Sequence, residues 1–393
     1  MNTVQGPGRS GGGYRKSLGL LGLVSLGIGG TIGSGIFVVP GIAAGISGPY
    51  SLIAWLIVAF SASCVLLSLA WTSSVYRSTG AFYGIFRNVF GEQVSTVLVI
   101  TYTVSSVFGI ATIAAGLGQY FSFFGTRDPL PLEFLVLAVF CLVNLWGIYF
   151  SSLAENILTL VKVIPLVIIT ILLIPFIHVE NLTPLQAVSP LGILQTIIIV
   201  YWPFTGFEIS AIPAGETKDP RTIARSLIIV QVCVVSIYFF LNLALIGSVG
   251  SAVLAASPAP VAAAAGLVFG KSEYIVGVIG VIAMISALNA YLIGTSRVIQ
   301  NLSEEHRFPV FGQITARGVP GSALVVAAVL SGALLLFSNH FDTLAGIAVI
   351  TTLVPYIFIC AAAFTLGREK RIRAVAGAGA LSTAAILIAY FLS

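Results

Sequence analysis

Long apolar runs separated by short polar segments organise this sequence. An α-helix needs about 20 apolar residues to cross a hydrocarbon core of about 30 Å. Runs such as 160–177 are apolar throughout, whereas membrane β-strands would alternate in polarity over about ten residues. The pattern therefore predicts an all-α integral membrane protein with eleven transmembrane helices, at residues 18–42, 50–75, 94–124, 131–150, 156–177, 189–213, 225–248, 274–300, 322–338, 342–366 and 374–392.

Composition excludes a soluble protein. Of the 393 residues, 58% are hydrophobic and 8% are charged, whereas about a quarter of an ordinary soluble domain is charged. The loops between the runs are too short to form a separate soluble domain. We therefore expect a single multi-pass unit whose main partner is the lipid bilayer.

The basic residues predict an orientation, because short cytoplasmic loops retain Lys and Arg. With a cytoplasmic N-terminus, fifteen basic residues fall inside and two, Arg127 and Lys271, fall outside. Lys162 lies within a span. This distribution predicts a cell membrane protein (plasma or inner membrane) with its C-terminus outside, and it accounts for the +5 net charge without a nucleic-acid partner. The fifteen are Arg9, Arg15, Lys16, Arg77, Arg87, Lys218, Arg221, Arg225, Arg297, Arg307, Arg317, Arg368, Lys370, Arg371 and Arg373.

The N-terminal segment and the cysteines carry no chemistry of their own. Residues 1–17 form a Gly-rich polar tail, predicted to be cytoplasmic, without the short apolar region and cleavage site of a signal peptide. The four cysteines lie in four different spans with no C-x-x-C pair. They are therefore interpreted as small packing residues.

Enzyme motifs occur only in the wrong context. Residues 6–11 match G-x-G-x-x-G and residues 8–12 match G-x-S-x-G, but neither motif follows a strand or opens a helix. Residues 270–272 resemble the end of a phosphate-binding loop that lacks its first glycine. His178, His306 and His340 lie in predicted loops, and no H-E-x-x-H motif is present. We expect no enzyme activity, no catalytic residue, no metal site and no cofactor.

The first and sixth spans contain helix-breaking residues at mid-depth. The first has Gly29, Gly30, Gly33 and Gly35, and each glycine in a helix interior costs about 1 kcal/mol relative to alanine. Close helix packing through the pattern Gly29-x-x-x-Gly33 is the alternative explanation. The sixth has Pro203 and Gly206 three residues apart, which favours a second break.

The spacing of these two segments predicts an internal repeat. Five spans separate the two breaks, as expected for two five-helix inverted repeats whose first helices are interrupted. The predicted domains are the tail 1–17, a first repeat at 18–177, a second repeat at 189–366 and an extra transmembrane helix at 374–392.

Interrupted helices expose backbone groups that suit a zwitterion. The amides where the first helix restarts carry about half a positive charge from the helix dipole and suit a carboxylate. The carbonyls at the ends of the outer segments suit an ammonium group. We therefore predict that Gly33, Ser34 and Gly35 bind a substrate carboxylate, and that the backbone carbonyls of Thr31, Ile32, Phe204 and Thr205 bind a substrate ammonium group.

The same residues carry a resemblance to the amino acid-polyamine-organocation transporter family. Residues 33–37 (GSGIF) and 202–208 (WPFTGFE) resemble its first- and sixth-helix signatures, and residues 78–83, 216–220, 289–291 and 295–297 resemble later family segments in the same order. The resemblance implies a leucine-transporter-type fold of ten core helices, usually followed by two more. This chain ends after an eleventh predicted span, which puts the usual end helices in doubt.

Two ionisable residues within spans are candidates for proton coupling. Lys162 lies in the middle of the fifth span, where a charge costs at least about 2.5–3.5 kcal/mol, so it is either functional or a cap for helix carbonyls. In sodium-independent members that this chain resembles, a fifth-helix lysine takes the place of a sodium ion between helices one, five and eight. The resemblance makes Ser286 its expected neighbour. Glu208 is either an acid that favours a helix dipole or, as its match to the family motif implies, a proton-linked group or a counter-charge for the substrate.

Trp202 is the candidate gate. The resemblance places it over the substrate, and the alternative is an interfacial anchor. The sequence thus predicts a secondary transporter for amino acids or related amines, working by alternating access, independent of sodium, and either proton-coupled or exchanging. An uncoupled amino-acid or polyamine facilitator and a transporter-like sensor are the alternatives. Neutral amino acids are the favoured substrates, because Glu208 is the only charge near the predicted site; protons are possible co-substrates, and the sequence does not specify the oligomeric state.

Overall fold

The computed structural model describes residues 19–75, 82–183, 188–211, 217, 221–306 and 309–392. The predicted tail 1–17 lies outside these residues, as do Arg77, Lys218 and Arg307 and the predicted family segment 216–220 apart from Thr217. All regular elements in the described part of the chain are helices.

Sixteen α-helices follow one another in the described residues. They are α1 (Leu20–Thr31), α2 (Ser34–Ser47), α3 (Ser51–Val75), α4 (Phe82–Phe90), α5 (Glu92–Phe123), α6 (Leu130–Leu145), α7 (Ile148–Leu173), α8 (Val179–Leu182), α9 (Pro190–Tyr201), α10 (Arg221–Ala256), α11 (Pro260–Phe269), α12 (Glu273–Glu305), α13 (Pro309–Gly312), α14 (Gly321–Phe337), α15 (Phe341–Leu366) and α16 (Lys370–Leu392).

Eight helical segments of the described chain are long and apolar enough to cross a membrane. One of them, Leu20–Val75, contains the first two predicted spans. The predicted spans at 131–150 and 322–338 correspond to the shorter apolar helices α6 and α14. The all-helical membrane architecture is therefore present, while the division into eleven spans remains a prediction.

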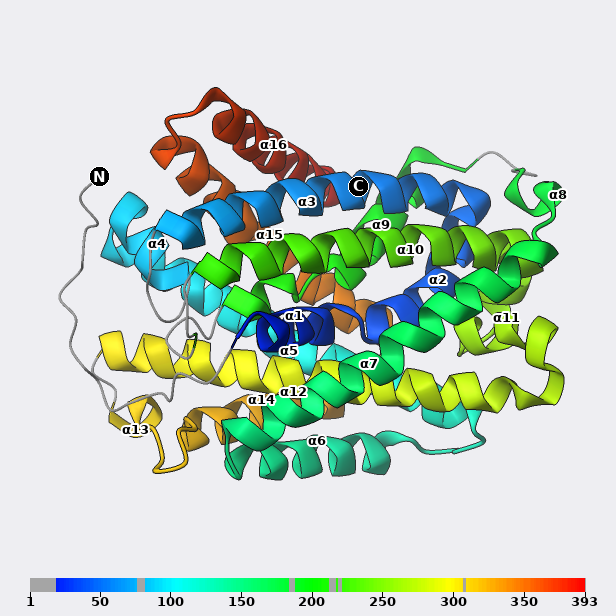
Figure 1. The fold of residues 1–393 in the computed structure, drawn as a ribbon, viewed down its shortest axis with the longest axis horizontal. Coiled ribbons are helices and arrows are strands. Elements are labelled where there is room, and N and C mark those ends of the chain that lie inside the picture. The colour runs from blue at the N-terminus through cyan, green and yellow to red at the C-terminus, as the bar shows by residue number, and fades with distance from the viewer. Residues whose placement is uncertain are drawn as a thin grey trace.

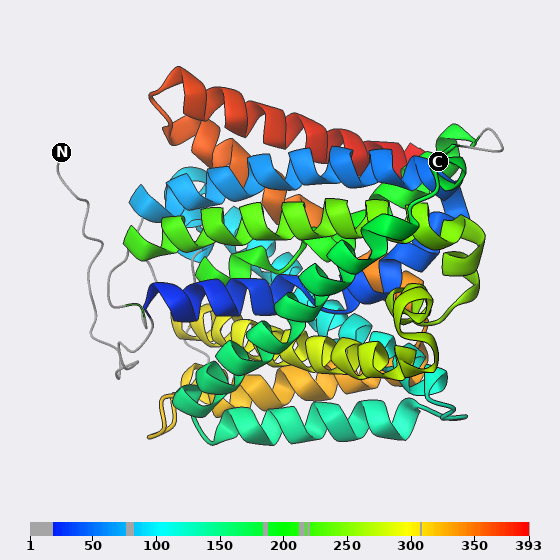
Figure 2. The same ribbon diagram turned by 45° about the vertical axis from the view of Figure 1, so that its right-hand side comes forward.

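The long helices lie side by side as one bundle (Figure 1). α5 lies inside it and packs against α12 and α15, while α10 packs against α1, α2 and α3. α16 lies at one edge, against α15 and α3, and α6 lies at the opposite edge (Figure 1). In Figure 2, α1 begins at the left end of the bundle and the C-terminus lies at the right end.

The helices turn apolar side chains outward as well as inward. On α7, Leu160 and Ile164 are 61% and 53% exposed, whereas Lys162 between them is fully buried. In a lipid solvent this arrangement is favourable, because the exposed apolar face meets hydrocarbon and the buried face can hold polar groups that pair within the protein.

Candidate functional site

The first helix of the bundle is interrupted at Ile32 and Gly33. α1 ends at Thr31, where Ile32 is extended (φ −84°, ψ 95°), and α2 restarts at Ser34. The first amides of a helix have no partner within that helix. The amides of Ser34 and Gly35 therefore face the interruption, with the positive end of the α2 dipole behind them.

A second interruption follows α9. The chain passes through a 3-10 turn at Trp202–Phe204, an extended Thr205 (φ −85°, ψ 163°) and Gly206, and then a second 3-10 turn at Phe207–Ala211. Gly206 has φ +92°, a left-handed conformation that residues with a Cβ rarely adopt. Pro203 cannot donate the amide hydrogen bond that a continuous helix would need.

The two interruptions touch each other backbone to backbone. A Cβ atom on Gly35 would stand 2.6 Å from the Cα of Pro203, and one on Gly30 would stand 2.9 Å from the carbonyl oxygen of Gly206. The indole Nε1 of Trp202 donates to the hydroxyl of Ser34 at 3.2 Å. Gly30 and Gly35 therefore permit close packing of the two segments on either side of the interruption at Ile32 and Gly33.

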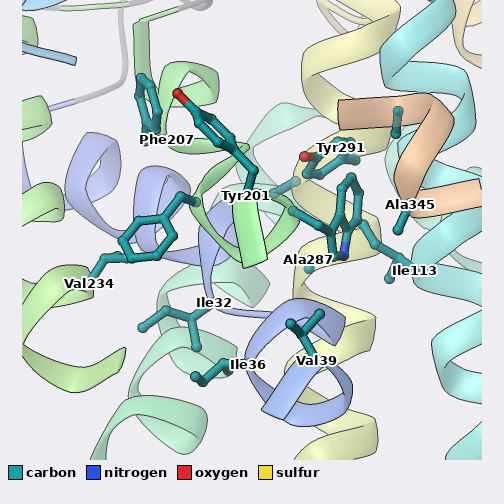
Figure 3. Packing of buried hydrophobic residues seen from close by; sticks show 14 of the residues in the cluster. Ile32, Ile36, Val39, Ile113, Tyr201, Phe207, Val234, Ala287, Tyr291 and Ala345 are labelled. Carbon is teal, nitrogen blue, oxygen red and sulfur yellow. The ribbon is translucent and has the colours of Figure 1, made fainter. Parts of the chain in front are cut away.

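A small cavity lies where the interruptions meet. The space open to the centre of a water molecule is about 10 Å³, roughly enough for one water. Its lining contains no acidic or basic side chain. In Figure 3, Ile113, Ala287 and Tyr291 lie together on one side of the interruption, and Ile32 and Val234 lie on the other. The lining residues are Gly30, Thr31, Gly33, Ser34, Gly35, Ile113, Trp202, Thr205, Ala287 and Tyr291.

Most of the residues predicted to bind substrate line this cavity. All three residues of the predicted carboxylate site do so, together with Thr31, Thr205 and Trp202, whereas Ile32 and Phe204 are buried outside the lining. The carbonyl oxygen of Thr31 accepts a hydrogen bond from the Tyr238 hydroxyl at 2.7 Å. A carbonyl has two lone pairs, so that oxygen keeps one for a further donor.

Tyr291 of α12 forms one wall of the cavity. Its hydroxyl lies 3.1 Å from the Thr205 hydroxyl, and its ring centroid lies 6.0 Å from that of Trp202. A Cβ atom on Gly109 of α5 would stand 2.6 Å from the Tyr291 ring. The two aromatic rings thus lie against bare backbone, and they leave little room for a long substrate side chain.

Lys162 links three helices beside the first interruption. Its Nζ donates to the carbonyl oxygen of Gly29 at 2.9 Å and to the hydroxyl of Ser286 at 2.8 Å. These partners belong to α1 and α12, while Lys162 belongs to α7. A second contact between α7 and α1 is the bond from the Thr159 hydroxyl to the carbonyl of Ser25 at 3.1 Å. The lysine therefore replaces a missing intrahelical partner of α1 and ties α12 to it.

Glu208 lies on the other side of the second interruption, 2% exposed. Its Oε1 accepts from the hydroxyl of Tyr102 at 3.0 Å, and its Oε2 accepts from the hydroxyl of Tyr356 at 2.6 Å and from the amide of Gly206 at 3.0 Å. Tyr102 and Tyr356 belong to α5 and α15. The carboxylate therefore joins the interrupted segment to both of these helices.

Tyrosines are the site residues that sequence reasoning did not identify. Tyr102, Tyr238 and Tyr356 hold the groups described above, and Tyr291 entered only as part of a family segment. Each lies inside an apolar span, where a buried hydroxyl normally has a partner. That rule marks them as candidates, but the partner becomes visible only when distant helices are brought together.

The site offers backbone amides, carbonyls and hydroxyls, without a metal-binding cluster. Among the described residues no group of three or more His, Cys, Asp or Glu side chains could hold a metal ion. The arrangement suits reversible binding of a small polar molecule with an anionic and a cationic end.

Comparison with known proteins shows a family whose model matches this chain. Residues 18–393 match the family model described as "Amino acid permease". The match covers both interrupted segments and every candidate site residue, so the family and the site geometry concern the same part of the chain.

Three characterised relatives have similar length and low identity. The chain is 26% identical to the cadaverine/lysine antiporter of Escherichia coli K12 over 370 residues, covering 88% of this chain and 82% of that protein. It is 24% identical to the serine/threonine exchanger SteT of Bacillus subtilis over 376 residues, covering 91% and 85%. It is also 24% identical to the branched-chain amino acid permease BcaP of Bacillus subtilis over 385 residues, covering 91% and 82%.

Proposed function

The chain belongs to the amino acid permease family, in the amino acid-polyamine-organocation superfamily, and from that premise we propose that it carries small neutral amino acids across the plasma membrane. The family is one of transporters, so the chain is a multi-pass membrane transporter and not an enzyme. The substrate, the coupling ion and the transport cycle are the proposed part.

The observation that carries the proposal is the cavity between the two interrupted helices. The amides of Ser34 and Gly35 are placed for a carboxylate, and the carbonyls of Thr31 and Thr205 are placed for an ammonium group. A zwitterionic amino-acid backbone satisfies both ends at once, whereas a molecule with one charge leaves the other end unpaired.

The lining of the cavity favours a short neutral side chain. Ile113, Ala287 and the rings of Trp202 and Tyr291 are its apolar surfaces, and the hydroxyls of Ser34 and Thr205 are its polar ones. A diamine such as cadaverine has no carboxylate to meet the α2 amides, and a lysine side chain would need a counter-charge that the lining lacks. The chemistry of these surfaces suits serine, threonine and alanine, which would enter once the segments move apart and enlarge a cavity that now has room for about one water molecule.

Lys162 is the proposed centre of coupling. Charged, it holds α1, α7 and α12 together through Gly29 and Ser286, as a bound sodium ion would. A buried charge is costly, so loss of the proton in one conformation of the carrier is favourable, and the freed helices can then move apart. Transport is accordingly independent of sodium and is driven by a proton gradient or by exchange.

Alternating access is proposed to follow from the same two segments. Trp202 covers the cavity as a gate from one side, and the Tyr102–Glu208–Tyr356 cluster closes the other. In this proposal residues 18–177 and 189–366 are inverted repeats that rock against each other, with α16 outside them. The N-terminus is cytoplasmic and the C-terminus outside, as the basic residues favour and as the opposite positions of the α1 start and the C-terminus in Figure 2 support.

Uptake by proteoliposomes tests the proposal. Purified protein is reconstituted and supplied with a panel of labelled amino acids and diamines, with and without an inward proton gradient, in sodium and in potassium buffers. We expect uptake of serine, threonine or alanine, stimulated by the gradient or by amino acid inside the vesicles, and unchanged by sodium.

Other outcomes separate the alternatives. Uptake that neither a gradient nor internal substrate stimulates indicates an uncoupled facilitator. Substrate binding in the absence of any flux indicates a sensor. Uptake of cadaverine in preference to every amino acid overturns the proposed site, because the α2 amides would then have no carboxylate to bind.

A further inference from the structure

Glu133 is an acid that the proposed transport cycle does not use. It stands in the first turn of α6, where an acid normally faces water and stabilises the positive end of the helix. Here the residue is only 1% exposed, and its Oε2 has no hydrogen-bond partner among the described residues. A buried polar group without a partner is rare and requires an explanation.

The carboxyl group of Glu133 is held against the backbone of α5. A Cβ atom on Gly118 would overlap with its Oε1, so the carboxyl occupies the space that a side chain at Gly118 would fill. Gly118 lies two residues beyond Gly116, where a Cβ would stand 2.8 Å from the Cβ of Ser34. The contact between α5 and α6 is therefore next to the wall of the substrate cavity.

The groups around Glu133 do not neutralise a negative charge. Asp128, on the loop before α6, has the same sign and acts on Glu133 through space. The only charged residue of α5 is Glu92 at its other end, and α14 contains none. α12 begins with Glu273 and carries Arg297, Glu304 and Glu305 further along. Arg127 on the loop, Lys162 on α7 and Arg297 on α12 are the cations of neighbouring elements. Within the described residues Arg87 and Glu92 form the one ion pair, so none of these cations is paired with Glu133.

We infer that Glu133 is a proton-binding site, separate from Lys162 and Glu208, and that its bound proton holds the end of α5 against α6. A neutral carboxylic acid can be buried at that contact at far lower cost than an unpaired carboxylate, and the helix dipole is too weak to reverse this order. When the proton leaves, the carboxylate moves toward water and the contact between α5 and α6 loosens.

The sign of the pH dependence follows from this assignment. Burial without a partner for Oε2 favours the neutral acid over the carboxylate, so the stabilisation of the contact is present at low pH and is lost as pH rises. Glu133→Gln keeps the size and the neutral state at all pH values. The parent protein and this variant are therefore expected to differ at high pH and to agree at low pH.

Thermal unfolding of the purified protein in lipid nanodiscs tests the inference without any substrate. Between pH 5 and pH 8 the melting temperature of the parent should fall by about 2 °C or more relative to Glu133→Gln. Glu180→Gln, a change at an exposed acid of α8, is the matched control and should show no such difference. A difference between parent and Glu133→Gln that stays constant with pH overturns the inference.

A second variant covers the case in which Glu133→Gln does not fold. Gly118→Ala displaces the carboxyl from its contact, so it should lower the melting temperature at pH 5 and remove the extra fall between pH 5 and pH 8. A full fall retained in Gly118→Ala contradicts the inference. These readouts do not depend on transport, so their failure is distinct from a failure of the proposed function.

Discussion

Gly33 and Ala287 face each other with no space between them, since a Cβ atom on Gly33 would overlap with the Cβ of Ala287. Gly33 caps α2, and Ala287 lies in the middle of α12. The position of the α2 amides, and hence of the proposed carboxylate site, is therefore set by a contact between a residue without a side chain and a single methyl group.

Enlarging Gly33 should move the site, and shrinking Ala287 should restore it. Gly33→Ala adds one methyl group to a filled contact, which costs about 1–3 kcal/mol when neighbours must shift. We expect uptake to fall at least about tenfold in Gly33→Ala and to recover at least in part in Gly33→Ala/Ala287→Gly. Initial uptake rates and melting temperatures of both variants measure this. Normal uptake by Gly33→Ala would show that the amides of this turn do not bind the substrate.

Lys162→Met removes the charge that joins α1, α7 and α12 and keeps an unbranched side chain that is one atom shorter. Without the bonds to Gly29 and Ser286, substrate should still bind while the stimulation by an inward proton gradient is lost. Binding by calorimetry and uptake with and without the gradient separate the two effects. Ser286→Ala, which removes the hydroxyl acceptor and leaves the Gly29 carbonyl in place, should have a smaller effect. Full gradient-driven uptake by Lys162→Met would move the coupling to Glu208.

Replacing Glu208 by glutamine should disrupt the cluster at the second interruption. The carboxylate accepts from Tyr102, Tyr356 and Gly206. The NH2 group of a glutamine cannot accept, so at least one of these hydrogen bonds is lost or reversed, at a cost of about 1–3 kcal/mol. We expect Glu208→Gln to lose uptake and the pH dependence of what remains. Tyr356→Phe, which leaves two donors in place, is the milder comparison. An unchanged pH profile in Glu208→Gln would remove this residue from the coupling mechanism.

Two variants of Trp202 distinguish its role as a cover of the cavity from its role as a hydrogen-bond donor to Ser34. Trp202→Phe loses the bond to Ser34 but keeps a ring against Tyr291, so affinity should change less than about threefold. Trp202→Ala opens the cavity and should weaken substrate binding by about tenfold, the loss expected when an aromatic contact worth about 1.4 kcal/mol disappears. Equal affinities in the two variants would argue for an anchor and against a gate.

The orientation can be tested with single cysteines in a background without the four native ones. An impermeant thiol reagent added to intact cells should label cysteines at Ser272 and Asp342 and should leave cysteines at Lys218 and Arg371 unlabelled. Opening the cells should make the last two reactive, which controls for their accessibility. Labelling at Lys218 in intact cells would reverse the predicted topology.

Local sequence signals predicted the interruptions closely. The glycines between 29 and 35 indicate a break in the first helix, and the chain leaves helical geometry at Ile32 and Gly33. Pro203 and Gly206 indicate the second break, and the chain is extended at Thr205. These signals work because the freedom of glycine and the restriction of proline belong to the residues themselves, whatever the helix packs against.

Hydrogen bonds between residues far apart in the sequence could not be predicted from local sequence signals. Tyr102 and Tyr356 are separated from Glu208 by 106 and 148 positions in the sequence, and no periodicity determines which face of α5 or α15 they occupy. Glu133 was missed for a related reason, because an acid in the first turn of a helix is ordinarily solvated. Only the packing of α6 against Gly118 makes it unusual.

The smallness of the central cavity limits leakage of ions through the carrier. A continuous file of water molecules would let protons or metal ions follow their gradients without a cargo molecule. The 10 Å³ at the meeting point of the interrupted helices holds about one water molecule, so this conformation interrupts such a file. In this conformation the meeting point of the two segments therefore offers ions no continuous water-filled path.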